Sequence, residues 1–402
     1  MRRPLTSIGL PVAAILTLLL GSSLVAPTAA ASGSVSVVTT VPVGAGPMGV
    51  ATSGGFIYVT NASGNSVSVI DGSTNLVVAT IAVGLYPHDI VVAGGYAFVA
   101  NKVSDNVSVI QLSNGTVVST ITVGDGPQGI TAANGYIYVA NWYDHTLSVI
   151  NASLAVTTPS SAVVATVQAG YTPHGVAVAN GFVYVTDVFD DEVSIIDISR
   201  ILTDPTNARI GAIAVGDGPR GIIESGGMLY VANNDGDTIS VINQSTNQVV
   251  RTFTTGDGPY GLAAAGGYLY VTNQNANSLT VFASADGSEV STVPVGNLPH
   301  SVALGTDFAY VANFSSNNVT VIRAVFPASD TSIPTAPQQA YSIDAADTCG
   351  TNVPDSVALP GLVGSPSLGW GKSWQQWPNN GTGGFVCVRQ PFYTNSGTWS
   401  AR

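Results

Sequence analysis

Four acidic side chains stand within the six-residue stretch DVFDDE, which covers residues 187–192. Only 8% of the chain is charged, so such a density is unusual for this sequence. Carboxylates held this close repel one another unless solvent or a cation screens them, and carboxylate oxygens suit divalent cations. Asp190, Asp191 and Glu192, with His145 from an equivalent loop, therefore form a candidate metal site. A solvated acidic rim and a recognition patch for a basic partner are the alternatives.

A second group with chemical potential is a column of residues that each follow a proline. Three of the four histidines occupy it, together with an arginine and a tyrosine: His88, His174, Arg220, Tyr260 and His300. Neutral imidazoles suit zinc or copper, and a guanidinium group suits a carboxylate or a phosphate. The column is therefore a candidate site for a metal or an anionic ligand. In the alternative interpretation each histidine caps a strand and bonds a neighbouring carbonyl group.

The element that must position these residues is a repeat. Segments of the form YVTN, YVAN, FVAN or YVTD end at positions 61, 101, 141, 187, 233, 273 and 313, at spacings of 40, 40, 46, 46, 40 and 40 residues. Each copy has a proline fourteen residues upstream and contains up to four β-rich runs separated by Gly, Pro and Asn. Four short strands in about 40 residues are typical of one propeller blade. The sequence predicts an all-β, seven-bladed β-propeller.

The two ends of the repeat region indicate how the ring closes. The seventh unit stops after its third run, NVTVI (318–322), and the missing fourth run stands at the front as VSVVTTVPVG (35–44). An unpaired edge strand invites aggregation, so pairing these two runs removes a liability. We expect the N-terminal strand to complete the last blade.

The patterns P-x-G, Y-V-[TA]-N, S-V-I and V-V-x-T-I-x-V-G over residues 35–323 resemble the YVTN-type β-propeller repeat family. Relatives in that family include exported bacterial proteins and repeats of archaeal surface-layer proteins. The resemblance implies the propeller fold. It implies no single activity, because the family shares a fold and not a reaction.

In a propeller whose strands run outward from the axis, the proline column and the loop after YVTN open on one face, called here the top face. Asn or Asp recurs at both ends of that loop, where such side chains close turns by bonding the backbone. This interpretation covers Asp187 and extends to Asp191. Asp190 and Glu192 have no equivalent role in every blade and are the stronger metal candidates.

The N-terminus indicates an exported protein. Residues 1–31 resemble a secretory signal, with Arg2 and Arg3, an apolar run VAAILTLLL and an Ala-rich cleavage site before Ser32. That run is shorter than the ~20 residues of a membrane-spanning helix, so we expect no span after signal removal. The net charge of −12 disfavours nucleic acid and anionic membrane surfaces as partners. We expect a secreted, extracellular or cell-surface location.

The expected domains are the signal at 1–31, the propeller at 32–323, a Pro- and Ala-rich linker at 324–340 and a small module at 341–402. The module holds four of the five tryptophans and both cysteines. Two cysteines in an exported chain most simply form one disulfide, here between Cys349 and Cys387.

The sequence contains no G-x-S-x-G, H-E-x-x-H, Walker or C-x-x-C-H motif. This favours a secreted binding or scaffold protein, whose top face takes a protein, a glycan or a small-molecule ligand. The alternative is a metal-dependent lyase or hydrolase that acts at the top of the channel and needs a divalent cation. That alternative depends on analogy with other propellers of the same fold. No catalytic residue is assigned, and no other cofactor is indicated.

Overall fold

The structure is a computed structural model that describes residues 35–325, 369–376 and 385–392. The chain divides into two compact units, Met1–Ala336 and Pro337–Arg402. No helix in the described ranges is both long and apolar enough to cross a membrane. The predicted signal at 1–31 and nearly all of the predicted linker at 324–340 lie outside the described residues.

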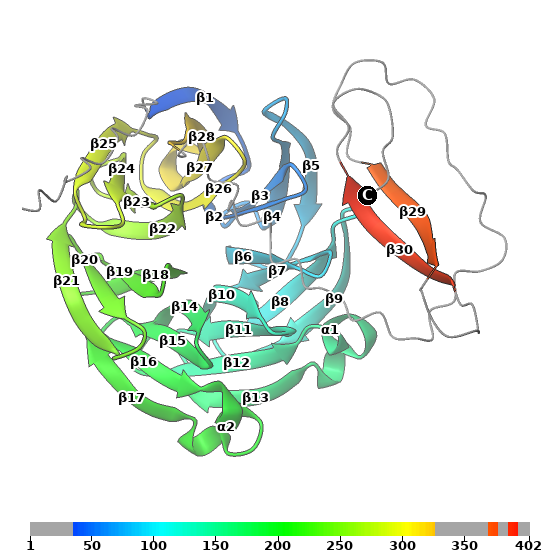
Figure 1. Ribbon diagram of the computed structural model, residues 1–402, viewed down its shortest axis with the longest axis horizontal. Coiled ribbons are helices and arrows are strands. Elements are labelled where there is room, and N and C mark those ends of the chain that lie inside the picture. Colours follow the sequence, from blue (N-terminus) through cyan, green and yellow to red (C-terminus); the bar gives the residue numbers. More distant parts are fainter. Residues whose placement is uncertain (1–34, 326–368, 377–384, 393–402) are drawn as a thin grey trace, which may run out of the picture. The chain divides into compact units, whose positions relative to one another are not determined.

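The first unit is a ring of seven four-stranded antiparallel sheets, which confirms the predicted fold (Figure 1). Blade 1 contains β2 (Pro47–Ser53), β3 (Phe56–Asn61), β4 (Ser66–Asp71) and β5 (Leu76–Ala82); blade 2 contains β6 (Pro87–Ala93), β7 (Tyr96–Asn101), β8 (Asn106–Gln111) and β9 (Thr116–Thr122). Blade 3 contains β10 (Pro127–Ala133), β11 (Tyr136–Asn141), β12 (Thr146–Asn151) and β13 (Val163–Gln168); blade 4 contains β14 (Pro173–Ala179), β15 (Phe182–Asp187), β16 (Glu192–Asp197) and β17 (Arg209–Ala214). Blade 5 contains β18 (Pro219–Ser225), β19 (Met228–Asn233), β20 (Thr238–Asn243) and β21 (Gln248–Thr254); blade 6 contains β22 (Pro259–Ala265), β23 (Tyr268–Asn273), β24 (Ser278–Ala283) and β25 (Glu289–Pro294). Blade 7 contains β26 (Pro299–Leu304), β27 (Phe308–Asn313), β28 (Asn318–Arg323) and β1 (Ser36–Pro42).

The N-terminal strand closes the ring, as predicted. Strand β1 pairs antiparallel with β28, from Ser36 opposite Arg323 to Pro42 opposite Asn318. Blade 7 is therefore built from both ends of the repeat region. Without β1, the backbone of β28 would be an unpaired edge.

The hydrophobic core lies between neighbouring blades. One apolar cluster fills each of the seven interfaces, and the one between blades 1 and 2 joins Tyr58 and Val67 to Ile90 and Ala97. The second and third strands of each blade supply most of these residues, because their β-branched and aromatic side chains face a neighbouring sheet on each side. Each blade is thus held in place by the blade on either side of it.

The first strand of every blade lies nearest the ring centre and the fourth lies on the rim (Figure 1). The glycine of the P-x-G motif lets neighbouring inner strands approach closely. A Cβ atom on Gly129 would lie 1.9 Å from the carbonyl oxygen of His174, and one on Gly175 would lie 2.3 Å from that of Arg220. The residue between Pro and Gly is therefore fixed at the ring centre by backbone packing.

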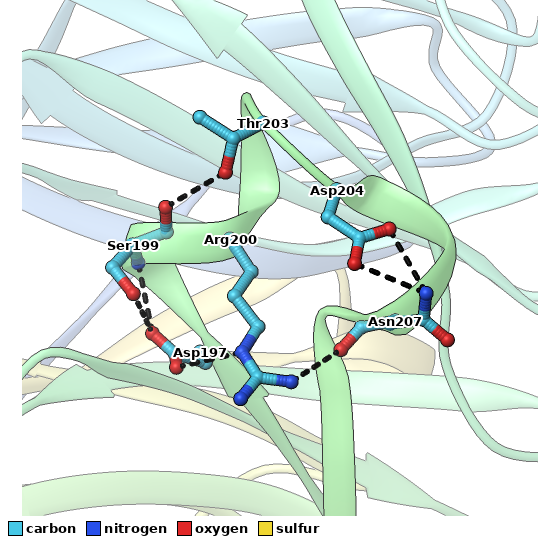
Figure 2. A network of polar contacts seen from close by, with 6 residues as sticks. All are labelled: Asp197, Ser199, Arg200, Thr203, Asp204 and Asn207. Carbon is cyan, nitrogen blue, oxygen red and sulfur yellow. Dashed lines mark hydrogen bonds and ion pairs between the residues drawn. The ribbon is translucent and has the colours of Figure 1, made fainter.

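Two six-residue insertions fold into short helices between the third and fourth strands of blades 3 and 4. They form α1 (Leu154–Thr157) with η1 (Pro159–Ser161), and α2 (Ile198–Ile201) with η2 (Pro205–Asn207). Figure 2 shows the second insertion, in which Asp197 caps α2 by accepting from the backbone N–H of Ser199 at 2.9 Å. Ile201 is 2% exposed and packs into the core between blades 3 and 4. These insertions extend the interblade core and contribute nothing to the top face.

The second unit contains two described strands, β29 (Gly369–Gln376) and β30 (Phe385–Phe392), which pair antiparallel. Cys387 lies in β30, whereas Cys349 lies outside the described residues. The disulfide between them stays a prediction.

Candidate functional site

Two turns meet on the top face of each blade and are joined by backbone hydrogen bonds. One turn precedes the proline of the first strand, and the other joins the second and third strands. In blade 3 the N–H of Trp142 donates to the carbonyl of Gly126 at 3.0 Å, and that of Tyr143 donates to Asp125 at 3.1 Å. Equivalent bonds recur around the ring, for example from Val188 to Thr172 in blade 4. This confirms that the proline column and the loop after YVTN open on one face.

The structure brings the predicted proline-column residues together at the ring centre. The ring centroids of His88 and His174 are 5.5 Å apart, and His174 Nε2 lies 2.8 Å from the hydroxyl of Tyr260. The rings of Tyr260 and His300 are 4.5 Å apart. Blades 2, 4 and 6 are not neighbours, so the contacts of His174 with His88 and Tyr260 cross the propeller axis. We call His88, His174, Arg220, Tyr260 and His300, with the inward residues described next, the axis cluster.

A second layer of the axis cluster was missed by sequence reasoning. It consists of the residue directly after the second strand of each blade: Ala62, Lys102, Trp142, Val188, Asn234, Gln274 and Phe314. Three of these contact the histidines. Trp142 lies 5.9 Å from His174 between ring centroids, Gln274 Nε2 lies 2.9 Å from His300 Nε2, and Phe314, in η3 (Phe314–Ser316), lies 5.4 Å from His300. A different residue type stands at this position in each of the seven blades, whereas the rest of the loop is repetitive. That variation is the feature of the sequence that could have indicated a functional position.

The three histidines of the axis cluster are buried and neutral at neutral pH. Their exposed fractions are 6% for His88, 5% for His174 and 9% for His300. Burial lowers the pKa of His88 and His174 well below the usual value and lowers the pKa of His300 to about 4. The charges of Lys102 and Arg220 lower the pKa of His88 and of His174 further, and the charge of Arg220 does so for His300. The Nδ1 atom of each histidine has no hydrogen-bond partner among the described residues.

The axis cluster also holds two cationic side chains. The Arg220 guanidinium carbon lies 5.2 Å and the Lys102 amine 5.7 Å from the centre of the Trp142 ring. Burial, followed by the nearby charge of Arg220, lowers the pKa of Lys102. The two ion pairs found among the described residues, Asp197 with Arg200 and Glu192 with Arg209, include neither cation. Two mutually repelling cations therefore share one aromatic ring without an anionic partner in contact.

Asp89 is the one acidic residue of the inner strands near this cluster, and sequence reasoning missed it. It replaces the glycine that most blades have after the column residue. Its carboxylate accepts hydrogen bonds from the backbone N–H groups of Ile90 at 2.8 Å and Ile130 at 3.4 Å. Burial nevertheless raises the pKa of Asp89 to about 6. At neutral pH a carboxyl group with this pKa is mostly ionised, but among the described residues Asp89 forms no ion pair with Lys102 or Arg220.

Threonines in three of the second strands position the column residues of the next blade. Thr60 donates to the carbonyl of His88 at 3.0 Å, Thr186 to that of Arg220 at 2.7 Å and Thr272 to that of His300 at 2.6 Å. The other four blades have alanine at this place. The alternation between YVT and YVA in the repeat thus reflects which interblade contacts include a side-chain hydrogen bond.

The predicted metal ligands Asp191 and His145 hold a turn in place. Both have left-handed backbones, with φ of 52° and 57°. Asp191 Oδ1 accepts from the N–H of Gly218 at 2.8 Å, and His145 Nδ1 accepts from that of Thr172 at 3.1 Å. The same bond is made by the equivalent residue in every other blade: Asn65, Asp105, Asp237, Asn277 and Asn317. His145 thus accepts the same backbone hydrogen bond that asparagine or aspartate accepts in the other blades. Each of these bonds joins one blade to the next.

Asp190 and Glu192 also have structural partners, although the sequence indicated no role for them that recurs in every blade. Asp190 Oδ2 accepts from the N–H of Tyr171 at 2.8 Å, as Asp144 does from Asp125 at 2.7 Å. Glu192 forms an ion pair with Arg209. Among the described residues there is no group of three or more His, Cys, Asp or Glu side chains placed to hold a metal ion. The metal site at residues 145 and 190–192 stays a prediction, and these contacts give each residue another role.

Asp187 departs from the rest of its column. The other six blades have asparagine there, whose Nδ2 donates to side-chain oxygens on the third strand, as in the bonds of Asn233 to Thr238 and Ser240. In blade 4, Asp187 accepts from Ser194 Oγ at 2.6 Å and from the N–H of Gly170 at 3.0 Å. Burial raises the pKa of Asp187 to about 7, although Ser194 and Arg209 lower it.

Comparisons with known proteins agree with this fold. The family model described as "Lactonase, 7-bladed beta-propeller" matches residues 129–325, from the first strand of blade 3 to the end of blade 7. The LVIVD repeat model matches residues 86–115, in blade 2. A search of the curated proteins found no match.

Among solved structures, a chain of hydrazine synthase from Kuenenia stuttgartiensis is similar. The match has a TM-score of 0.62 and 24% identity, and it covers 72% of this chain and 97% of that one. Identity at this level shows a shared fold and carries no information about the reaction. The chain is a seven-bladed β-propeller whose last five blades are similar in sequence to the seven-bladed lactonases.

Proposed function

We propose that this chain is an exported binding protein of the YVTN type that holds a small anion at the propeller axis. The observation that carries this proposal is the pair of cations, Lys102 and Arg220, on the ring of Trp142 without an ion-pair partner among residues 35–325. The chain has a net charge of −12, so unpaired cations at its centre are not a consequence of composition. An anionic ligand would balance them.

The surroundings of the two cations suit an anion. Arg220 offers a planar fork of N–H donors that matches a carboxylate or a phosphate, and its Nε atom has no partner among the described residues. The histidine Nδ1 atoms are buried and unpartnered too, so a neutral imidazole can donate a hydrogen bond to the same ligand. A buried polar atom without a partner costs about 1–3 kcal/mol, which ligand binding would recover.

Replacing Arg220 by methionine should weaken binding of a small anion by about 10- to 100-fold, because a hydrogen bond to a charged group contributes roughly 1.5–3 kcal/mol. Calorimetric titration of the purified protein with inorganic phosphate and with acetate measures this. Arg323→Met is the matched control, since Arg323 also stacks on an aromatic ring, that of Phe308 at 5.4 Å, but lies on the outer part of blade 7. Equal affinities in the Arg220 variant and the parent would contradict the proposal.

The family-model match favours a second candidate function, hydrolysis of a lactone at the same cluster. Here the imidazole of His174 takes a proton from a water molecule that attacks the lactone carbonyl, and Arg220 stabilises the oxyanion. The ring C–O bond then breaks, and the leaving alkoxide receives the proton. The version that needs a metal has less support, since the described side chains include no group suited to hold one.

If the chain is a lactonase of this kind, His174→Asn should abolish turnover, because the carboxamide group of asparagine cannot act as a base. Acid release from a simple lactone, followed by titration at constant pH, measures this with and without chelator. Activity that survives chelator and disappears in the variant supports the metal-free reaction. Activity lost on chelation supports the metal-dependent form, and no activity in the parent removes this candidate.

A further inference from the structure

The top face is chemically divided into two halves. Two sets of equivalent positions, one of each per blade, show this. The first is the residue two positions before the proline of the first strand, such as Leu85 before Pro87. The second is the residue two positions after the last residue of the YVTN segment, such as Val103 after Asn101. In blades 2 to 4 five of the six positions in these columns hold exposed apolar residues: Leu85 at 52%, Val103 at 58%, Tyr143 at 56%, Tyr171 at 53% and Phe189 at 68% exposure. The sixth position is Asp125. In the other blades they hold Ala45, Ser63, Asp217, Asp235, Asp257, Asn275, Asn297 and Ser315. We call the five apolar residues the apolar crescent.

The apolar crescent is continuous with the axis cluster through one side chain. Tyr171 and Phe189 lie 6.0 Å apart between ring centroids, and Phe189 lies 6.4 Å from Trp142. Trp142 in turn lies 5.9 Å from His174 and carries Arg220 at 5.2 Å. A path of aromatic rings therefore leads from the unpaired cations at the axis to the exposed surface of blade 4.

We infer that the ligand of the axis cluster is an organic anion with a flat, apolar body, such as an aryl carboxylate or an aryl phosphate. This inference rests on the proposed function. The anionic group lies at Lys102 and Arg220, and the body lies against Trp142, Phe189 and Tyr171. Aromatic rings interact favourably when their centroids are about 4.5–7 Å apart. An aryl group of the ligand can therefore pack on the rings of Trp142, Phe189 and Tyr171 in the same way as these rings pack on one another.

Charge complementarity selects this occupant over others. A quaternary ammonium group or a lysine side chain also binds aromatic rings, but Lys102 and Arg220 at the inner end would repel it. Exposed acids stand on both halves of the top face, with Asp125, Asp144 and Asp190 beside the apolar crescent and Asp217, Asp235 and Asp257 on the other half. The cations at the axis are therefore the favourable place for an anionic group. A neutral apolar ligand would leave the two cations unbalanced. Only a ligand with both an anionic and an apolar part uses both features.

The test compares matched pairs of anions on the full-length protein by calorimetric titration. The pairs are 2-naphthoate with acetate, and phenyl phosphate with inorganic phosphate. We expect the aryl member of at least one pair to bind tenfold or more tightly than the small one. The pair that shows this preference identifies the anionic group.

The double variant Phe189→Ser with Tyr171→Asn should remove most of this preference while small anions bind as in the parent. Blade 7 has serine and asparagine in these two columns, at Ser315 and Asn297, so the substitutions fit the local fold. Leu76→Ser is the control for loss of an exposed apolar side chain, because Leu76 is 63% exposed on the outer strand of blade 1. The control should keep the full preference, and thermal melting checks that all variants are folded.

The outcomes separate this inference from the proposed function. If small anions bind through Arg220 and the aryl anions bind no better, the inference fails and the proposed function stands. If no anion binds, or the Arg220 variant binds as the parent does, the proposed function fails. If the parent forms a dimer that the double variant abolishes, the apolar crescent is a self-association surface and the inference is overturned.

Discussion

Deleting residues 32–44 is expected to abolish cooperative melting of the propeller or to cause aggregation. The deletion removes β1, whose backbone pairs with β28 from Ser36 to Pro42, and leaves β28 as an exposed edge. It also removes Val35 and Val41, which are 8% and 3% exposed and pack into the cores on the two sides of blade 7. Burying two such side chains is worth about 3–6 kcal/mol, a large part of the ~5–15 kcal/mol that stabilises most domains.

Calorimetric melting and size-exclusion chromatography measure this effect. Val38→Ser is the control, because Val38 is 45% exposed on the same strand and its loss leaves the pairing intact. The control should melt within a few degrees of the parent. A deletion variant that melts as the parent does would mean that the ring is stable without its N-terminal strand.

Replacing Asp187 by asparagine is expected to stabilise the protein above pH 7 and to have little effect near pH 4. Burial raises the pKa of Asp187 to about 7, so between about pH 4 and pH 7 the folded state binds a proton that the unfolded state has released. The contribution of this group to stability is therefore complete below its unfolded pKa and is lost as the pH rises through 7. The loss amounts to about 4 kcal/mol for a shift of this size.

Asparagine removes this loss because it does not ionise. Its Nδ2 can donate to Ser194, as the equivalent amide of Asn233 donates to Ser240 at 3.0 Å. The converse variant, Asn233→Asp, should be destabilised above neutral pH, since blade 5 has Val249 where blade 4 has Arg209. Urea unfolding at several pH values measures both variants. A difference between parent and Asp187→Asn that does not change with pH would show that the carboxyl group ionises normally.

The fold was readable from the sequence because each blade repeats the same solution to the same packing problem. A proline, a glycine and a buried YVTN strand recur at fixed spacing, and the missing fourth run of the last unit appears in front of the first. The shared position of His88, His174 and His300 also followed from the repeat. That they contact one another across the axis did not, because it depends on side-chain lengths in blades that are not neighbours.

The exact partners of the acidic cluster could not be predicted from the sequence, for a physical reason. Asp190 and Asp191 accept hydrogen bonds from the backbone N–H groups of Tyr171 and Gly218. Almost every residue type has a backbone N–H group, so the sequence does not indicate which of these groups is available as a donor. Lys102 and Trp142 were missed because nothing in the loop NKVSDN or NWYDHT says that its second residue turns toward the axis. The sequence drew attention to the acidic stretch 187–192, which lies in a turn of the top face. The charged groups without a contacting partner are instead Lys102 and Arg220, at the propeller axis.

The way in which β1 closes the ring sets how the propeller responds to mechanical tension. In the antiparallel pair, the start of β1 at Ser36 lies opposite the end of β28 at Arg323. A force that pulls the two flanking segments of the propeller apart therefore acts at one end of the pair and loads its hydrogen bonds one after another, beginning with the outermost. Such peeling requires far less force than sliding two strands past each other, where all the bonds are loaded together. Blade 7 is thus the point at which the ring opens under tension, and the other six blades, each formed from one continuous segment, open after it.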